Sequence, residues 1–168
     1  MRRFALTALF LLAACGTAED RDDRAGQDAA DVAQIEQAQE RHPPVVEVTP
    51  EPIAFTDIEQ SRFFGAGCAF IPEGREGYDP VLYTIDQRGL VKLEGELVTL
   101  AADAGSAEFP YGTRETYAGR AHSYRLTKGA GEGEVVGEES VGWPGSLTIR
   151  DRWDRVVYRS AGKLECGA

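Results

Sequence analysis

Residues able to perform acid–base or nucleophilic chemistry are scarce in this chain of 168 residues. It has two histidines, His42 and His122, and only His122 lies in a region rich in strand-forming residues. Ser123 follows directly, but neighbouring residues of a strand point to opposite faces, so His122 is badly placed to activate it. No His or Cys spacing is typical of a metal site. We therefore expect no catalytic residue, no metal and no enzymatic activity.

A glycine-rich stretch at residues 129–134 has the composition of a nucleotide-binding loop. A pattern of strand and turn follows it instead of a helix, and its glutamates would repel a phosphate. We expect a hairpin loop there and no cofactor.

The N-terminus has the layout of a secretory signal. Arg2 and Arg3 precede an apolar run from Phe4 to Ala14, which is too short to span a bilayer. The run ends in Leu12-Ala13-Ala14-Cys15, and this segment resembles the lipobox of bacterial lipoproteins.

The lipobox resemblance implies a cellular location for the protein. In that family residues 1–14 would be removed and Cys15 would carry the lipid, which anchors the mature protein to a membrane. Gly16 stands where the family uses aspartate for retention in the inner membrane. The resemblance thus implies the outer membrane with the domain in the periplasm, and exposure at the cell surface is the alternative.

Two further cysteines, Cys68 and Cys166, lie near the two ends of the remaining chain. Export would place them in an oxidising compartment, where an even pair predicts a disulfide. The bond would close a loop of roughly 100 residues, for which the chain-entropy model gives about 4.7 kcal/mol.

Composition divides the mature chain at Ile53. Residues 15–52 are polar and proline-rich at their end, with 10 acids against 3 bases from residue 16 onward, which is typical of a disordered tether. Inside it, Asp28 to Arg41 is a candidate for a transient helix with Asp28 as N-cap. Residues 53–168 are the predicted β domain.

The β domain is predicted to be mainly β: a small antiparallel β-barrel or sandwich with one short N-terminal helix, after a disordered tether. The helix signal is the capping-box pattern Thr56-Asp57-Ile58-Glu59, with Gly65 at its end, and we expect this helix to cover one end of the sheet. Turns are expected at 86–89, 94–96 and 160–162. The expected strands are 67–71, 81–86, 90–94, 97–101, 121–127, 134–138, 146–150, 155–159 and 163–166.

The formal net charge of −10 argues against a nucleic-acid partner, because a phosphate backbone would approach against the field of the protein. The domain itself is only mildly acidic, with 18 acids and 13 bases from Ile53 onward. Its aromatic residues are expected in the core and along strand edges.

Three short motifs, Tyr117-Ala118-Gly119, Thr127-Lys128-Gly129 and Val91-Lys92-Leu93-Glu94-Gly95, are similar to the MliC family of periplasmic inhibitors of C-type lysozyme. The resemblance implies a small β-barrel in which Lys128 and Thr113 engage the catalytic carboxylates of the enzyme, with Tyr117 in the same segment. Arg114 departs from the glycine of the family at its position.

Together these observations predict a lipid-anchored lipoprotein of the cell envelope whose β domain binds an unidentified ligand without catalysis. Its expected partners are the membrane, through the N-terminal lipid, and a protein of the envelope. Three alternatives are an MliC-like lysozyme inhibitor, a structural subunit of an envelope assembly and a hydrolase with a carboxylate site.

Overall fold

The computed structural model describes residues 18–74 and 77–168. The signal segment and Cys15 lie outside the described residues. The chain divides into two compact units between Pro43 and Pro44.

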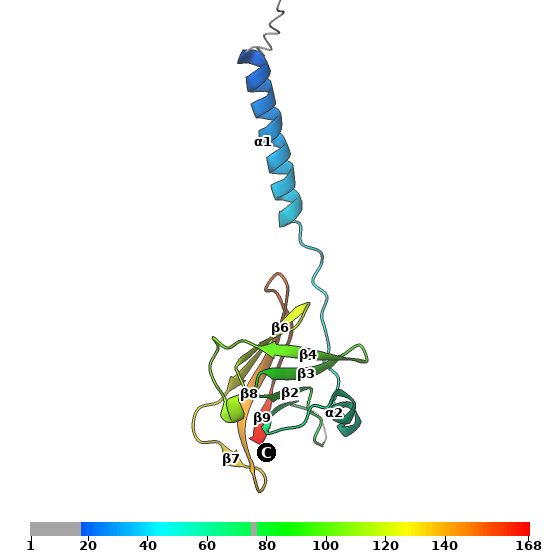
Figure 1. Ribbon diagram of the computed structural model, residues 1–168, viewed down its shortest axis with the longest axis vertical. Helices are drawn as coiled ribbons and strands as arrows, with labels where there is room; N and C mark the ends of the chain where they lie inside the picture. Colours follow the sequence, from blue (N-terminus) through cyan, green and yellow to red (C-terminus); the bar gives the residue numbers. More distant parts are fainter. Residues whose placement is uncertain (1–17, 75–76) are drawn as a thin grey trace, which may run out of the picture. The chain divides into compact units, whose positions relative to one another are not determined.

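The first unit contains helix α1, Ala18–Glu40 (Figure 1). Alanine, glutamate and glutamine, which are strong helix formers, recur throughout it. The helix is longer than the expected one because it begins at Ala18. Asp28, the expected N-cap, therefore lies in its interior. Its apolar residues Val32 and Ile35 are exposed. The expected tether is therefore helical over residues 18–40.

The second unit is a β-barrel, with all neighbouring strands antiparallel. Its elements are helix α2 (Phe55–Ser61), strands β1 (Gly67–Pro72), β2 (Leu82–Ile85), β3 (Arg88–Leu93) and β4 (Glu96–Ala102), the short 3-10 helix η1 (Pro110–Gly112), and strands β5 (Thr116–Ala118), β6 (His122–Lys128), β7 (Glu134–Val135), β8 (Ser140–Asp151) and β9 (Val156–Gly167).

Two pairings between strands that are not consecutive in sequence, β6 with β8 and β9 with β1, close the barrel. Strands β1 to β6 follow one another as a meander, β6 then pairs with β8, and β8 pairs with β9. The circle is completed where β9 pairs with β1. Strand β7 pairs only with β8 and lies outside the circle of eight strands. Of the two predicted architectures, the structure is the barrel.

The predicted disulfide is confirmed, and it lies at this closure. Cys68 of β1 and Cys166 of β9 are directly opposite each other, with a Cα–Cα distance of 4.0 Å and a sequence separation of 98. Both are almost completely buried. The bond therefore joins the first and last strands of the barrel.

Large side chains fill the interior of the barrel. They come from every wall, because alternate residues of each strand point inward. The fully buried ones include Phe70, Leu82, Leu100, Tyr117, Tyr124, Leu126, Leu147, Ile149 and Leu164.

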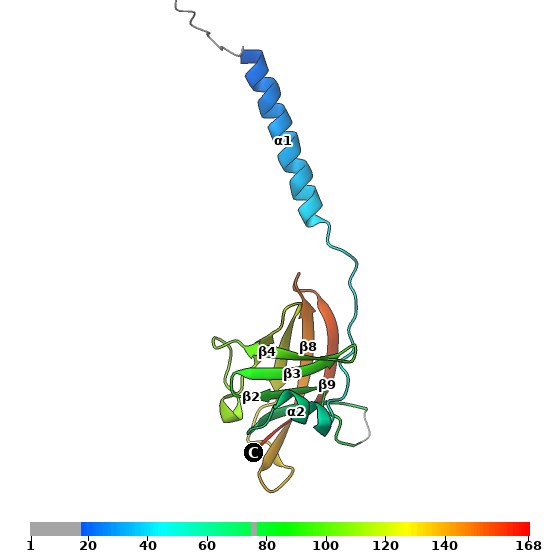
Figure 2. The same cartoon turned by 45° about the vertical axis from the view of Figure 1, so that its right-hand side comes forward.

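Helix α2 packs on the outer wall of the barrel, and the expectation that it covers an end of the sheet is wrong. Ile53, Ile58 and Phe63 pack with the outward-pointing Ile85 of β2 and Leu90 of β3, in a cluster separate from the interior. Figure 2 shows α2 in front of the wall, beside β2 and β3. A continuous apolar surface outside β2 and β3 attracts the helix there.

The ends of α2 also differ from the expected ones. The N-cap is Ala54 instead of Thr56, and its backbone N–H donates to the Asp57 carboxylate at 2.9 Å. The helix ends at Ser61 because Arg62 adopts a left-handed conformation (φ 50°), ahead of Gly65.

The expected turn at 160–162 is wrong, since these residues lie in the middle of β9 and join two predicted strands into one. Gly162 serves close packing instead of a turn. A Cβ on Gly162 would overlap with the carbonyl oxygen of Ile71 and lie 2.8 Å from Cζ of Phe70. In a sequence, a glycine can indicate either a turn or a close approach of two strands.

Strand β8 begins at Ser140, well before the expected start at residue 146, and other strand boundaries agree with the sequence more closely. The hairpin turns after β2 and β3 lie at the expected positions. Strand β7 ends at Val135, earlier than expected, and the three-residue β5 gave no strand pattern.

The domain begins before Ile53. Backbone hydrogen bonds run from Val48 N–H to the Val157 carbonyl and from Glu51 N–H to the Lys92 carbonyl. Residues 44–52, assigned above to the tether, therefore belong to the compact unit of the barrel.

Gly162→Ala tests the close strand approach. The added methyl group has no room against the β1 backbone, so we expect a loss of about 1–3 kcal/mol in the free energy of unfolding, measured by urea denaturation. Gly137→Ala is the matched control, because the nearest heavy atom to its Cβ would be at 3.6 Å. Equal free energies of unfolding for the two variants would contradict the role of Gly162 in the close packing of β9 against β1.

Candidate functional site

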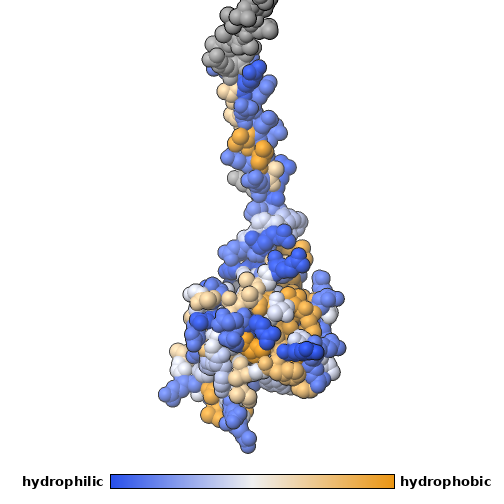
Figure 3. Space-filling view, in the orientation of Figure 1, coloured by the Kyte–Doolittle hydropathy of each residue, from blue (hydrophilic) through white to orange (hydrophobic). Residues whose placement is uncertain are grey.

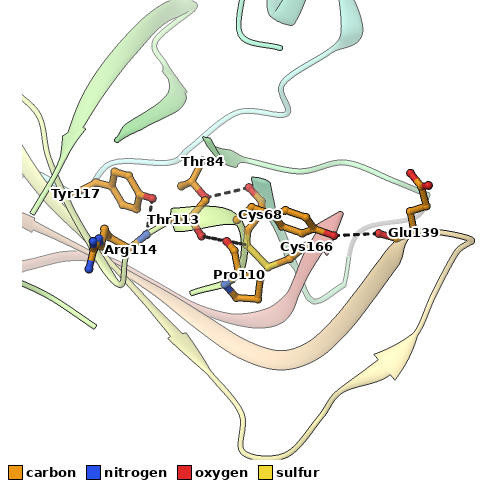
Figure 4. The surroundings of a disulfide bond; sticks show 9 residues. Cys68, Thr84, Pro110, Thr113, Arg114, Tyr117, Glu139 and Cys166 are labelled. Atoms are coloured by element: carbon orange, nitrogen blue, oxygen red, sulfur yellow. Dashed lines mark hydrogen bonds between the residues drawn. A yellow bond between two sulfur atoms is a disulfide. The ribbon is translucent and has the colours of Figure 1, made fainter. Parts of the chain in front are cut away.

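The structure buries two of the three residues predicted to contact a partner. Thr113 and Tyr117 are both fully buried. The Thr113 hydroxyl donates to the Pro110 carbonyl at 2.9 Å and lies 3.3 Å from Cys68 Sγ, and the Tyr117 hydroxyl accepts from the Arg114 N–H at 2.8 Å (Figure 4). Neither side chain is available at the surface.

Thr113 and Tyr117 instead make polar contacts that hold η1 and the residues after it next to the disulfide. The Thr84 and Thr113 hydroxyls also lower the pKa of Tyr117, and Thr84 donates to the Cys68 carbonyl at 3.2 Å. Burial raises the pKa of Tyr117 above its usual value, although the Arg114 N–H opposes the shift. The hydroxyl groups that suggested a binding loop are thus satisfied within the fold.

Lys128, the third predicted residue, lies at the end of β6 and is partly buried. Its Nζ is 4.7 Å from the centre of the Trp143 ring and donates to the Gly129 carbonyl at 3.3 Å. Trp143 in turn donates its indole N–H to the Gly131 carbonyl. The structure therefore gives Lys128 an intramolecular role, which fastens the glycine-rich loop to β8.

His122 and Ser123 show the expected opposite orientation. The His122 ring meets Tyr124 edge-on, with ring centres 6.4 Å apart, on the same face of β6. Burial lowers the pKa of His122, while the charge of Asp151 opposes this shift.

The described residues form neither a metal cluster nor a membrane-spanning helix. No group of three or more His, Cys, Asp or Glu side chains there could hold a metal ion. No helix within residues 18–74 and 77–168 is long and apolar enough to cross a membrane.

An exposed aromatic surface beside α2 is the strongest candidate site. Phe55, Phe64 and Tyr78 are 66%, 57% and 58% exposed. Two adjoining cavities of about 320 and 350 Å³ share Phe55, Ile58, Tyr78 and Tyr83 in their walls, and Phe64 lines the first of them. Figure 3 shows apolar side chains gathered on the side of the domain where α2 lies in Figure 1. We call this surface, formed by Phe55, Ile58, Phe64, Tyr78 and Tyr83, the aromatic groove.

The end of α2 explains why Phe64 is exposed. Phe63 and Phe64 are adjacent, and the left-handed turn at Arg62 directs Phe63 onto the barrel wall, where it is 4% exposed. Phe64 then points away from the wall. Two adjacent phenylalanines after a short helix cannot both enter one core layer, and this is the sequence signal that could have indicated the site.

Tyr83 forms part of the floor of the groove and hydrogen-bonds with Tyr78. Partial desolvation raises the pKa of both hydroxyls, at Tyr78 against the opposing effect of Tyr83, and the negative charge of Glu165 raises both further. Both tyrosines therefore stay protonated at neutral pH and offer polar groups in an otherwise apolar surface.

A partly buried ion pair fixes α2 beside the groove. The Asp57 carboxylate accepts from the Ala54 N–H at 2.9 Å and from Lys92 Nζ of β3 at 3.2 Å. The Ala54 N–H is the main cause that lowers the pKa of Asp57 below 3.8, and Lys92 adds to it, against the opposing effect of burial. One carboxylate thus both caps the helix and ties it to the barrel.

No protein-family model, no curated protein and no solved structure matches this chain. The site is therefore assigned from its own geometry.

Asp57→Asn tests how α2 is held. Since the folded state lowers the pKa of Asp57, its carboxylate stabilises the fold above pH 3.8, and this contribution is lost as the pH falls through the lowered pKa. We expect Asp57→Asn to lower the free energy of unfolding by about 1 kcal/mol at pH 7, and the difference from wild type to shrink below pH 3.8. Urea denaturation from pH 7 to pH 3 measures it.

Glu59→Gln is the control for Asp57→Asn, because Glu59 is an exposed acid of the same helix. A difference between Asp57→Asn and wild type that stayed constant with pH would refute the role of the carboxylate charge.

Proposed function

We propose that this protein is a lipid-anchored lipoprotein of the outer membrane whose β domain is a non-enzymatic binding module in the periplasm. The support for the anchor is the segment Leu12-Ala13-Ala14-Cys15. A lipidated Cys15 with two or three acyl chains would hold the chain on a membrane surface. Acidic residues of the tether would repel anionic lipid headgroups and favour separation of the domain from the membrane.

The observation that carries the binding role is the aromatic groove. Small monomeric proteins rarely expose several large aromatic side chains together, and such surfaces are typical of interaction sites. Phe55, Phe64 and Tyr78 are all more than half exposed, whereas side chains pack the barrel interior. A ligand would therefore bind on the outside of the wall, and a protein of the envelope suits an open groove of this kind.

The lysozyme-inhibitor alternative uses other residues. It requires Thr113 and Lys128 to enter the cleft of an enzyme, whereas Thr113 is fully buried and Lys128 stacks on Trp143. These contacts favour the aromatic groove over Thr113 as the binding surface. An assembly subunit would use the same groove, so that alternative differs in the number of partners and not in the site.

The anchor is tested by two neighbouring substitutions. Cys15→Ser removes the thiol that would carry the lipid, so we expect the protein to move from the membrane fraction to the soluble periplasmic fraction. Gly16→Asp keeps Cys15 and introduces the residue used for inner-membrane retention, so we expect it to move the protein to the inner membrane. Fractionation and the mass of the N-terminal peptide measure both, and membrane-bound Cys15→Ser protein would contradict the anchor.

Photo-crosslinking tests the groove in intact cells. With p-benzoylphenylalanine in place of Phe64, we expect a discrete product of higher mass, because this side chain would lie against the bound partner. Val135 is the control position, since it is 76% exposed and lies on β7, outside the cavity walls of the groove. The same product pattern at both positions would refute the groove as a specific site.

A further inference from the structure

The charged side chains of the described residues that line the two cavities of the aromatic groove are acidic. Among the described residues, Glu165 lines the 320 Å³ cavity and Asp79 lines the 350 Å³ cavity, and no lysine or arginine lines either one. The groove therefore combines aromatic faces with carboxylates.

Glu165 is held in place by the fold. It lies on β9 opposite Ala69 of β1, and its side chain is 18% exposed. One carboxylate oxygen, Oε1, pairs with Lys163 Nζ at 2.8 Å. Lys163 lines a different cavity, so it offsets the charge of Glu165 from outside the groove. The field of Glu165 still reaches the groove, since it raises the pKa of both Tyr78 and Tyr83.

No cation of the described residues lies over the rings of Phe55, Phe64 or Tyr78. In the described part of the chain, Arg88 stacks on Phe63, Lys128 on Trp143, and Arg152 and Arg155 on Trp153. Within that same part, no such contact involves Phe55, Phe64 or Tyr78. These rings are available to a cation from another molecule.

From this arrangement we infer that the aromatic groove binds an arginine or lysine side chain of a protein partner, flanked by apolar residues. The inference rests on the proposed function and specifies the chemistry of its ligand. Aromatic rings attract a cation through their quadrupole, and Glu165 would accept its N–H groups in a charge-assisted hydrogen bond. The acidic domain, with 18 acids and 13 bases, would steer a basic partner toward it.

The shape of the groove favours a peptide segment over a single small cation. Its two adjoining cavities share four wall residues and hold about 320 and 350 Å³. A cation could occupy the part beside Glu165, while the apolar neighbours of that cation in the partner contact Phe55 and Ile58. A quaternary ammonium headgroup of a lipid would fill only one of the two.

The test uses the full-length mature chain with Cys15→Ser, labelled with ¹⁵N and titrated with short blocked peptides. One peptide has arginine between two leucines, and the matched peptide has citrulline, which is neutral and nearly the same shape. Phosphocholine is the third probe. The backbone signals of Gly65, Tyr83 and Glu165 report binding in the groove.

We expect the arginine peptide to bind about fivefold more tightly than the citrulline peptide or better, which corresponds to about 1 kcal/mol of cation–π attraction. Glu165→Gln should reduce this preference, and Lys163→Met should increase it because Glu165 loses its internal partner. Glu132→Gln is the control for a general loss of negative charge, since Glu132 lies outside both cavity walls. Phe64→Ser should weaken both peptides.

The outcomes separate this inference from the proposed function. Equal affinity for the arginine and citrulline peptides would overturn the cationic ligand while leaving an apolar binding groove. Binding of phosphocholine alone would overturn the protein partner in favour of a lipid headgroup. Specific crosslinking at Phe64 in cells, without binding of either peptide, would overturn this inference and leave the proposed function standing. The wild-type spectrum retained in each variant shows that it is folded.

Discussion

The closure of the barrel between β1 and β9 is the contact on which the rest of the structure depends. It joins residues 67–72 to residues 162–167, almost the whole length of the domain apart in sequence. Bringing such distant segments together costs chain entropy, and the disulfide between Cys68 and Cys166 reduces that cost by constraining the unfolded chain. Phe70 and Leu164, the next inward-pointing pair, are fully buried beside it.

A closed and filled barrel leaves only its surface for binding. Tyr117 and Tyr124 are buried in the interior, and Thr113 is buried beside the disulfide. The apolar outer wall of β2 and β3 would be exposed if α2 did not cover it. The seven-residue α2 lies on this wall, and Phe55 of α2, Phe64 after it and Tyr78 remain more than half exposed.

The sequence predicted those features that depend on local pattern or on the even number of cysteines. The disulfide, most strands, two hairpin turns and the short helix are in this group. It did not predict the outer position of α2, because a capping pattern says where a helix begins but not which surface receives it. It also placed Thr113 at the surface and a turn at Gly162. A threonine whose hydroxyl is hydrogen-bonded in the interior cannot be told from a surface threonine by sequence alone. A glycine needed for close packing likewise cannot be told from a turn glycine.

The aromatic groove could not be predicted from the sequence, because its residues lie in several separate segments of the chain. Its residues come from α2, the segment after it, the β1–β2 connection and β2, so no short motif contains them. Tyr78 was expected to pack with the other aromatic residues, and only the three-dimensional structure shows that it is 58% exposed.

The alternation of residues along β1 and β9 links the closure to the groove. Cys68 and Cys166 point into the barrel, whereas the next opposed pair, Ala69 and Glu165, lies on the outer face. The inner side of this strand pair therefore carries the covalent bond, and its outer side forms part of the groove. Because a disulfide restricts the relative movement of the two strands, it also fixes the carboxylate of Glu165 relative to Tyr83 of β2, which pairs with Ala69. A binding surface built on this seam is preorganised, and a preorganised surface loses less entropy when it binds a partner.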